Sequence, residues 1–367
     1  MDSTNSLCWN NFSNDHKFGC LYHLSKWRDI IQASYGVSGC YLIASESHEI
    51  KKILIKNNLH IRNNEDSRVV GVFPLIHISS WFFGKSLVSI PYFDSSGVLT
   101  FDKITEIELL NKSIKLAEEL GVTQVEFRQN YQILSFEDFI NSQTAWKLSI
   151  STNKVRMVLD IPRDSEFLMK SFNSKLRSQI RKPIKEGLIA KIGGVELVND
   201  FYNIFVENMR DLGSPVHSKK FISEAVKAFP TANIFIVYSN HKPLAGSVTI
   251  GFKDTLSNPW ASSLRRYSHL APNMLLYWSM LEFACQNGYR RFDFGRSTIG
   301  EGTYKFKEQW GARPEPLYWY RLSKNGDQGW SGQPDKDKMS KAIEYWKKLP
   351  VPVTKIIGPR IRKYISL

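Results

Sequence analysis

The stretch FDFGRSTIGEGTYKFKEQWGARPEPLYW, residues 292–319, holds the densest group of chemically active residue types in the chain. Asp293 lies between two phenylalanines on an expected strand, so alternation turns its carboxylate away from both rings. Gly295, Gly300 and Gly302 follow, and glycine lets a backbone approach a ligand closely. A strand that leads a carboxylate into a glycine-rich loop predicts a ligand site at the end of the strand.

Two roles remain open for Asp293. Its carboxylate could deprotonate or orient an amine, or it could cap the loop or pair with Arg291 or Arg296. The spacing G-x-x-x-x-G is present, but Glu301 stands where a phosphate-binding P-loop requires lysine, which excludes a Walker site. No serine or cysteine stands beside a histidine in a recognised motif, so we do not expect covalent catalysis.

Two lysines follow this loop. Lys305 and Lys307 cannot share one helix face, so we expect at most one of them to face the site. There an exposed loop lysine could bind a phosphate or stabilise an oxyanion, and its removal would leave the fold intact. A lysine that is merely solvated is the alternative.

The second half of the chain reads as helices and strands around this stretch. Residues 272–287 form a helix that is apolar on nearly every side and therefore buried, and Gly288 ends it. A hairpin turn is expected at 240–243. The other expected elements are strands at 234–239, 244–252, 256–264 and 289–294 and helices at 164–187, 201–212 and 219–228.

The first half repeats this order. An amphipathic helix is expected at 103–120, and strands at 41–44, 50–55, 69–76 and 122–128, with a strand, a loop and a strand end in 87–102. The segment GVTQVEFR (121–128) matches GYRRFDFG (288–295), and each follows an expected helix. We infer two related α/β domains, with helix–glycine–strand as a merely common unit being the alternative.

A basic helix opens the second half. Within SEFLMKSFNSKLRSQIRKPIKEGL (165–188), six lysines and arginines outnumber two glutamates. Arg177 and Arg181 are four residues apart and share one face, where two guanidinium groups could hold phosphate. A solvated face is the alternative. Pro183 predicts a kink or an early end of the helix.

The whole chain of 367 residues is strongly basic, with a formal net charge of +14. That charge favours anionic partners such as nucleic acid, phosphorylated substrates or acidic lipid. The four cysteines form no C-x-x-C pair and the histidines occur singly, so no metal site is expected. The first residues do not resemble a signal peptide, and no apolar run is long enough to span a bilayer. These features predict a cytoplasmic protein.

Several blocks resemble the FemAB family. They are residues 292–319, the preceding WASSLRRYSHLAPNMLLYWSMLEFACQNGYRR, and KLRSQIRKPIKEGL. The likeness is strongest to FemAB-related proteins associated with exosortase/PEP-CTERM exopolysaccharide loci, which GVFPLIHISSWFFGKSLVSIPYFDSSGVL and the tail WKKLPVPVTKIIGPRIRKY also resemble. It covers most of the chain and is most specific over 260–311.

This resemblance implies two tandem GNAT-like α/β domains, the acyl-CoA N-acyltransferase fold, at 1–155 and 156–335, followed by a basic amphipathic tail at 336–367. It also implies transfer of an acyl or aminoacyl group to an amine. The family's F-K-x-x-F/W-G motif matches residues 306–311, so the resemblance favours Lys307 over Lys305 at the reaction centre. The family's R-x-x-x-R-K helix matches Arg177, Arg181 and Lys182.

We therefore predict an N-acyltransferase acting on a cell-envelope or exopolysaccharide precursor, with Asp293 and Lys307 as catalytic residues. The expected acceptor carries phosphate, linked to a nucleotide or a lipid, and tRNA is a further expected partner. Candidate substrate-binding residues lie in the basic helix or the 260–311 block: Arg177, Arg181, Lys182, Trp260, Arg296, Tyr304 and Lys305. The alternative hypothesis is a catalytically silent GNAT-like protein that recognises nucleic acid or a nucleotide signal in an exopolysaccharide system.

The donor is less defined. Acetyl-CoA-dependent GNAT enzymes carry a Q/R-x-x-G-x-G/A loop before a helix, where backbone N–H groups hold the pyrophosphate. The corresponding loop here, RRYSHLAPN (265–273), contains no glycine, so acetyl-CoA is not implied. We expect an aminoacyl-tRNA or an acyl thioester as donor, and no tightly bound cofactor.

The tail has its own pattern. An apolar helical face is expected from Met339, Ala342, Ile343, Trp346 and Leu349, before prolines 350 and 352 break the helix. From 341 to 367 there are seven lysines or arginines and one acid. Apolar residues surrounded by positive charge suit an anionic membrane surface, which would hold the enzyme peripherally on the inner membrane face. Packing of the tail across the two domains is the alternative.

Overall fold

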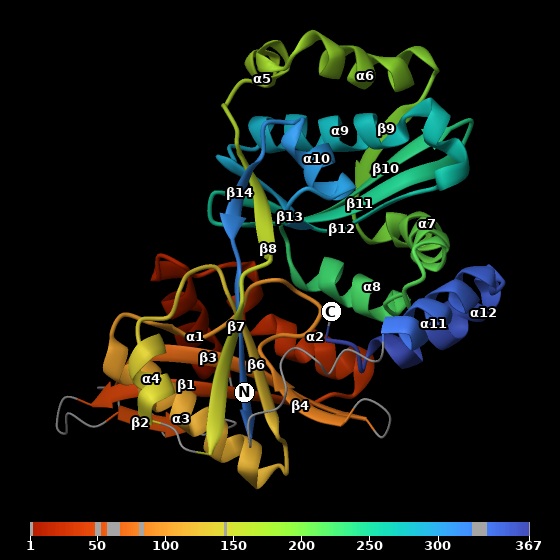
Figure 1. Cartoon of the computed structure of the whole chain (residues 1–367). Coiled ribbons are helices and arrows are strands. Elements are labelled where there is room, and N and C mark those ends of the chain that lie inside the picture. The colour runs from red at the N-terminus through yellow and green to blue at the C-terminus, as the bar shows by residue number, and fades with distance from the viewer. Residues whose placement is uncertain are drawn as a thin grey trace. The chain divides into compact units, whose positions relative to one another are not determined.

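The computed structural model describes residues 3–47, 53–56, 67–80, 84–142, 145–324 and 336–366, and the chain divides into two compact units. The first unit comprises Met1–Lys154, Pro316–Gln333 and Tyr364–Leu367, and the second comprises Val155–Glu315 and Pro334–Lys363. Each unit contains a sheet flanked by helices (Figure 1).

The sheet of the first unit has the order β2-β1-β3-β4-β6-β15-β7 in its described part, and the short β5 pairs with β3. Its strands are β1 Gly39–Ser47, β2 Ile53–Lys56, β3 Ser67–Ser80, β4 Gly84–Val88, β5 Leu99–Thr100, β6 Gln124–Gln129, β7 Trp146–Ser151 and β15 Tyr318–Lys324. Its helices are α1 Ser3–Asp15, the short η1 Leu21–His23, α2 Lys26–Tyr35, α3 Lys103–Glu119 and α4 Phe136–Ser142.

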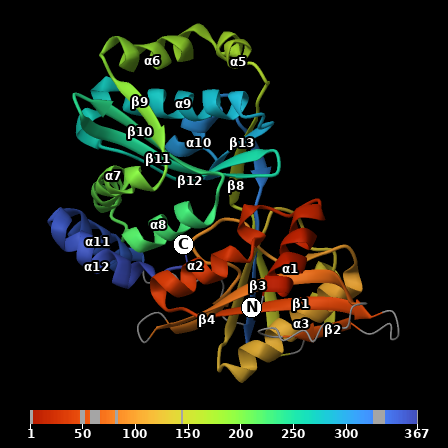
Figure 2. The ribbon, with the colours of Figure 1, turned by 180° about the vertical axis from the view of Figure 1, so that it is seen from behind.

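Alternation along β1 assigns its two faces to different helices. Leu42 belongs to the core that the apolar face of α3 completes. Tyr41 points the other way, and its ring lies 4.9 Å from that of Trp9 in α1. Figure 2 shows α1, α2 and α3 around this sheet. The first unit is therefore a sheet with helices on both faces.

The sheet of the second unit has the order β14-β8-β13-β12-β11-β10-β9. Its strands are β8 Lys154–Asp160, β9 Ile189–Gly193, β10 Ala232–Ser239, β11 Lys242–Phe252, β12 Thr255–Ser263, β13 Arg291–Thr298 and β14 Arg313–Pro316. Its helices are α5 Ser165–Ser171, α6 Ser174–Lys185, η2 Val195–Leu197, α7 Val198–Asp211, α8 Lys219–Ala228, η3 Arg265–Leu270, α9 Pro272–Gln286, α10 Gly302–Glu308, α11 Lys336–Lys348 and α12 Val351–Arg362.

Helix α9 occupies the centre of the second unit. Figure 1 shows α6 and α9 on one side of this sheet and α7 and α8 on the other. Most of the α9 side chains are buried, as its all-round apolar sequence predicts. The hairpin between β10 and β11 turns at Asn240 and His241, which both have positive φ angles, as a two-residue type I′ turn requires.

The two halves of the internal match occupy equivalent places. Strand β6 follows α3 and pairs in parallel with β4, while β13 follows α9 and pairs in parallel with β12. Val88 lies opposite Glu126 in the first unit, and Ser257 lies opposite Asp293 in the second. The acidic position of the match therefore falls at the same point of both sheets.

The basic helix differs from its prediction. Residues 164–187 form two helices, because Phe172 and Asn173 have extended backbones between α5 and α6. Asp164 caps α5 as expected, and the Asn173 side chain accepts a hydrogen bond from the Leu176 N–H at 2.8 Å to cap α6. The expected strand at 50–55 falls partly outside the described residues.

The tail forms two helices packed on α7 of the second unit. The chain breaks at Pro350, as predicted, but α12 begins directly afterwards with Pro352 in its first turn. Gly358 packs closely against Val216, and the Arg210 guanidinium donates to the Leu349 carbonyl at 3.2 Å. In the described part of the chain, no helix combines the length and apolarity needed to cross a bilayer.

One contact of the tail predicts a pH dependence of stability. Arg362 of α12 lies 3.2 Å from Nε2 of the buried His217, and burial together with this guanidinium holds the pKa of His217 well below its ordinary range. The unfolded chain then binds more protons below about pH 6.5. We expect the free energy of unfolding to fall with decreasing pH there, by up to about 1.4 kcal/mol per pH unit from this group.

Urea unfolding of the wild type and of the His217→Gln variant over this pH range checks the expectation. The variant should be less stable at neutral pH and should lose less stability on acidification. An equally steep loss in both proteins would assign the pH dependence to other groups.

Candidate functional site

A pocket of about 390 Å³ lies where two parallel strands of the second unit diverge. The registered pairing of β12 with β13 ends at Ser257 and Asp293. Beyond it, Gly295 adopts a φ of 75°, which an L side chain rarely tolerates. The pocket is lined from the end of β12, η3, the start of α9, α10 and one residue of α7: Asn208, Ala261, Ser262, Ser263, Leu264, Arg265, Ser268, Ala271, Pro272, Asn273, Tyr277, Gly302, Thr303, Phe306 and Lys307.

Of the two lysines considered in the sequence, Lys307 lines this pocket. It lies on α10 and is only 8% exposed, so it is not the exposed loop lysine that the sequence predicts. Its ammonium donates to the carbonyl oxygens of Gly295 at 3.0 Å and Arg296 at 2.7 Å. Lys305 is exposed and does not line the pocket. Strand β13 therefore fixes the position of the Lys307 charge.

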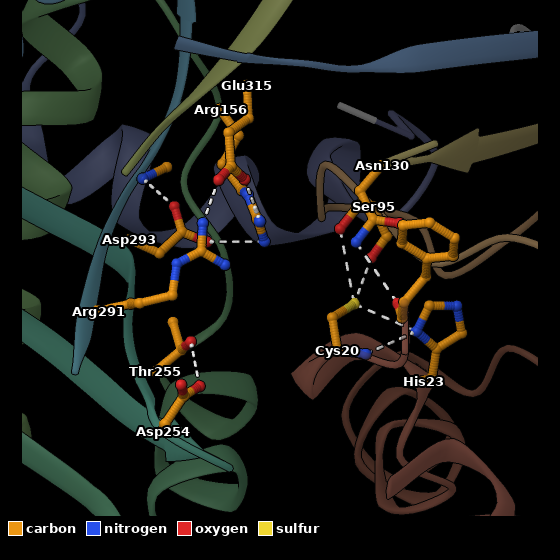
Figure 3. A network of polar contacts seen from close by, with 12 residues as sticks. Cys20, His23, Ser95, Asn130, Arg156, Asp254, Thr255, Arg291, Asp293 and Glu315 are labelled. Atoms are coloured by element: carbon orange, nitrogen blue, oxygen red, sulfur yellow. Dashed lines mark hydrogen bonds and ion pairs between the residues drawn. The ribbon is translucent and has the colours of Figure 1, made fainter. Parts of the chain in front are cut away.

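Asp293 is buried on β13 but does not line the pocket. Its carboxylate accepts a hydrogen bond from the N–H of Gly295 at 2.8 Å, two residues later in the same strand. The same carboxylate lies 3.7 Å from the guanidinium of Arg156 on β8. Figure 3 shows Asp293 beside Arg156.

Glu315 forms ion pairs with two arginines near Asp293. It pairs with both Arg156 and Arg291 (Figure 3). Arg291 also lies 3.7 Å from Asp160. This network ties β8, β13 and β14 together, and it gives Asp293 a positively charged neighbour.

Several polar pocket residues were not predicted. The Asn208 amide donates to the Ser262 hydroxyl at 3.0 Å, which links α7 to the end of β12. Tyr277 stacks on Phe294, and burial raises its pKa to about 12, so its hydroxyl stays protonated. Ser262 and Ser263 could have indicated this pocket in the sequence, because small polar residues at the end of a strand leave room for a ligand.

The remaining candidates of the 260–311 block lie outside the pocket lining. Trp260 is buried on the α8 side, with its ring 5.6 Å from that of Phe221. Arg296 contributes its carbonyl to Lys307, and Tyr304 packs against the core around α9. Trp260 is thus placed as a core side chain.

The basic helix carries a second pocket, of about 430 Å³. Arg177 and Arg181 share its lining, as their spacing predicts, together with Ser174, Ser178, Lys182, Lys185 and Glu186. Arg177 also donates to the Lys170 and Phe172 carbonyl oxygens at 3.2 and 3.1 Å, which fixes it at the break between α5 and α6. Its guanidinium is therefore held in place, whereas Arg181 and Lys182 are exposed.

The loop before α9 is a short helical segment, η3. The N–H groups of Tyr267 and Ala271 donate to the Leu264 and Ser268 carbonyl oxygens at 3.0 and 2.9 Å. At least these two N–H groups are engaged within the loop, in contrast to a glycine-rich loop that directs them at a pyrophosphate.

The first unit brings a cysteine and a histidine together. The Cys20 sulfur lies 3.2 Å from Nδ1 of His23 and 3.3 Å from the Ser95 carbonyl oxygen, to which it can donate (Figure 3). No sequence motif predicted this pair. Its members are three residues apart at η1, where the Cys20 N–H also donates to Nδ1, so the contact is part of the turn.

Comparison with known proteins agrees with this architecture. Residues 170–308 match the family model described as an acetyltransferase (GNAT) domain. Among curated proteins, none matches the sequence. The crystal structure of FemX superposes with a TM-score of 0.64 at 14% identity, covering 87% of this chain and 96% of that one.

Two further solved structures have similar folds. The C-terminal domain of a protein assigned as a lysylphosphatidylglycerol synthetase from Agrobacterium fabrum has a TM-score of 0.51 at 10% identity, covering 94% of this chain and 96% of that one. A tandem GNAT protein from the clavulanic acid biosynthesis pathway has a TM-score of 0.52 at 9% identity, covering 89% and 97%. The chain thus has a tandem GNAT-like α/β fold, as predicted, and its second unit carries the acetyltransferase (GNAT) domain match.

Proposed function

We propose that the second unit is an N-acyltransferase that joins an activated acyl or aminoacyl group to an amine of a phosphate-bearing cell-envelope or exopolysaccharide precursor. The observation that carries this proposal is Lys307, which lines the pocket and whose ammonium is held by two carbonyls of β13. The GNAT domain match over the same residues supports the reaction class.

The proposed reaction needs one positive group at the donor carbonyl. The amine nitrogen attacks the carbonyl carbon of an ester or thioester, and negative charge develops on the carbonyl oxygen. Lys307 would stabilise that oxygen electrostatically. The tetrahedral intermediate then expels an alkoxide or a thiolate, and the proton lost by the amine converts this leaving group to the alcohol or the thiol. Asp293 would act by holding Gly295 and Arg296 in place, and direct proton abstraction by Asp293 is the role that the experiment below tests.

The acceptor is assigned from charge. The pocket on α6 offers two guanidinium groups and two lysines, which suit phosphate oxygens. The similarity to a protein assigned as a lysylphosphatidylglycerol synthetase favours a phosphate-bearing lipid acceptor over a nucleotide-linked one. The exopolysaccharide connection rests on the resemblance to the exosortase-associated FemAB-related proteins. The proposed donor is an aminoacyl-tRNA or an acyl thioester.

Mass spectrometry of envelope precursors and polysaccharide tests the reaction class. Cells with and without the gene are compared, and an added acyl or amino-acid mass should occur only where the protein is present. Identical precursor masses in both cell types would contradict the proposal.

The Lys307→Met variant should lose about 10²–10³ in transfer rate per folded molecule, as expected for loss of an oxyanion partner. Methionine keeps the apolar stem of this buried side chain, and a thermal melt reports the remaining cost to the fold. Lys305→Met is the matched control two residues away and should retain full rate. If Lys307→Met transfers at the wild-type rate, Lys307 has no catalytic role.

The Asp293→Asn variant separates the two roles of the carboxylate. Asparagine can still accept from the Gly295 N–H but carries no charge beside Arg156. We expect a lower melting temperature, because Arg156 loses a buried partner, and an unchanged shape of the pH–rate profile. A profile whose acid limb vanishes would instead identify Asp293 as the base.

The Arg181→Ala variant should raise the KM for the acceptor by about tenfold and change kcat less, because charge-assisted contacts to phosphate contribute mainly to binding. Arg177→Ala should do the same while also lowering the melting temperature through its lost contacts to α5. Lys175→Ala, exposed on the same helix but outside the pocket, is the control. An unchanged acceptor KM with weaker tRNA binding would move this helix to the donor side.

A further inference from the structure

We propose that the outward face of α11 and α12 is a docking surface for an anionic phospholipid membrane. The inference deepens the proposed function, on which it rests, because it would hold the transfer site next to lipid-linked acceptors. It concerns binding only, so it can be tested without any transfer reaction.

The inner side of the two helices is used for packing. Thr354 and Gly358 of α12 are buried, and Ile343 of α11 packs against Gly213 at the end of α7. The Arg362–His217 contact adds a polar anchor at the end of α12. The tail is therefore a fixed part of the second unit, and its opposite side is a surface of defined composition.

That opposite side exposes large apolar side chains. Tyr345 is 71% exposed, Ile356 is 62% exposed and Val353 is 40% exposed. Val353, Ile356 and Arg360 follow one another at spacings of three and four, so they form one stripe along α12. Apolar side chains of this size in solvent forgo the free energy that burial would provide.

The charges around these side chains favour an anionic lipid surface. Lys341 and Lys348 flank Tyr345 at helical spacing, Arg360 follows Ile356, and all three cations are exposed. Glu344, the acid of the segment from 341 to 367, is paired with Lys347 at 2.8 Å. This combination suits the headgroup region of an anionic membrane. The acyl chains there can contact the exposed apolar side chains and the tyrosine ring, and the lipid phosphates can pair with the cations.

A nucleic acid fits this face less well. Phosphates would satisfy Lys341, Lys348 and Arg360, but the backbone of a duplex offers no apolar surface for Val353 and Ile356. The stripe of exposed aliphatic side chains therefore favours a membrane over a nucleic acid, and the cations favour a membrane that contains anionic lipids.

Vesicle sedimentation tests the proposal with the full chain. The protein should sediment with phosphatidylcholine–phosphatidylglycerol vesicles at low salt, remain in solution with pure phosphatidylcholine vesicles, and bind the mixed vesicles more weakly at high salt. Replacing Lys341, Lys348 and Arg360 by serine together should weaken binding to mixed vesicles about 10²-fold, since each cation near such a surface contributes about fivefold. Ile356→Ser should weaken it about tenfold.

Matched controls separate this face from general charge and apolarity. Serine at Lys115, Lys191 and Lys220 removes three exposed cations elsewhere, and Ile104→Ser removes an isoleucine that is 70% exposed on α3. Both controls should bind vesicles like the wild type, and thermal melts should show all variants folded.

Three results would overturn the proposal. The wild type could fail to bind mixed vesicles, the control triple variant could lose as much binding as the tail triple variant, or the tail triple variant could lose tRNA binding while keeping vesicle binding. The envelope mass difference is measured independently. Loss of vesicle binding with the mass difference retained refutes only the docking surface, and vesicle binding without a mass difference refutes only the proposed function.

Discussion

The divergence of β12 and β13 beyond Ser257 and Asp293 is the constraint on which the site depends. Parallel strands that part leave backbone groups without ladder partners, and buried groups of this kind need other partners. Here the Gly295 and Arg296 carbonyls receive theirs from Lys307, and the Gly295 N–H donates to Asp293. The separation of β12 and β13 thus determines where the Lys307 ammonium, the Asp293 carboxylate and the pocket lie.

The first unit uses the equivalent point differently. Glu126, at the position of Asp293, pairs with the fully buried Arg128 at 2.6 Å. Arg128 also donates to the Phe93 carbonyl at 2.6 Å and lies over the Trp319 ring. At this point the first unit has a buried ion pair whose arginine is also hydrogen-bonded to a backbone carbonyl. The equivalent strand pairs of the two units therefore end in chemically different environments.

Local sequence patterns predict the local structure of this chain, but they do not predict which distant strands pair with one another. Apolar periodicity and glycine positions give α3 and α9, and Asp164 marks the start of α5. The return of β15 to the first sheet depends on partners nearly 200 residues earlier, which no local pattern encodes. In the site, the motif indicated Lys307, but the position of its ammonium depends on two carbonyls of β13, which no local pattern encodes. The burial of Trp260 could not be predicted, because an aromatic residue has the same sequence pattern in a core and in a binding site.

The path of the chain has a consequence for its synthesis. Strand β15 lies between β6 and β7, and its pairing is the ladder that joins β7 to the sheet among the described strands. The N-terminal unit cannot complete its sheet until residue 324 has left the ribosome, by which time the strands of the second unit have all emerged. A nascent chain of this design leaves the β6 edge of its first sheet without β15 and β7 through most of translation, and an exposed strand edge of this kind is a site that chaperones can shield.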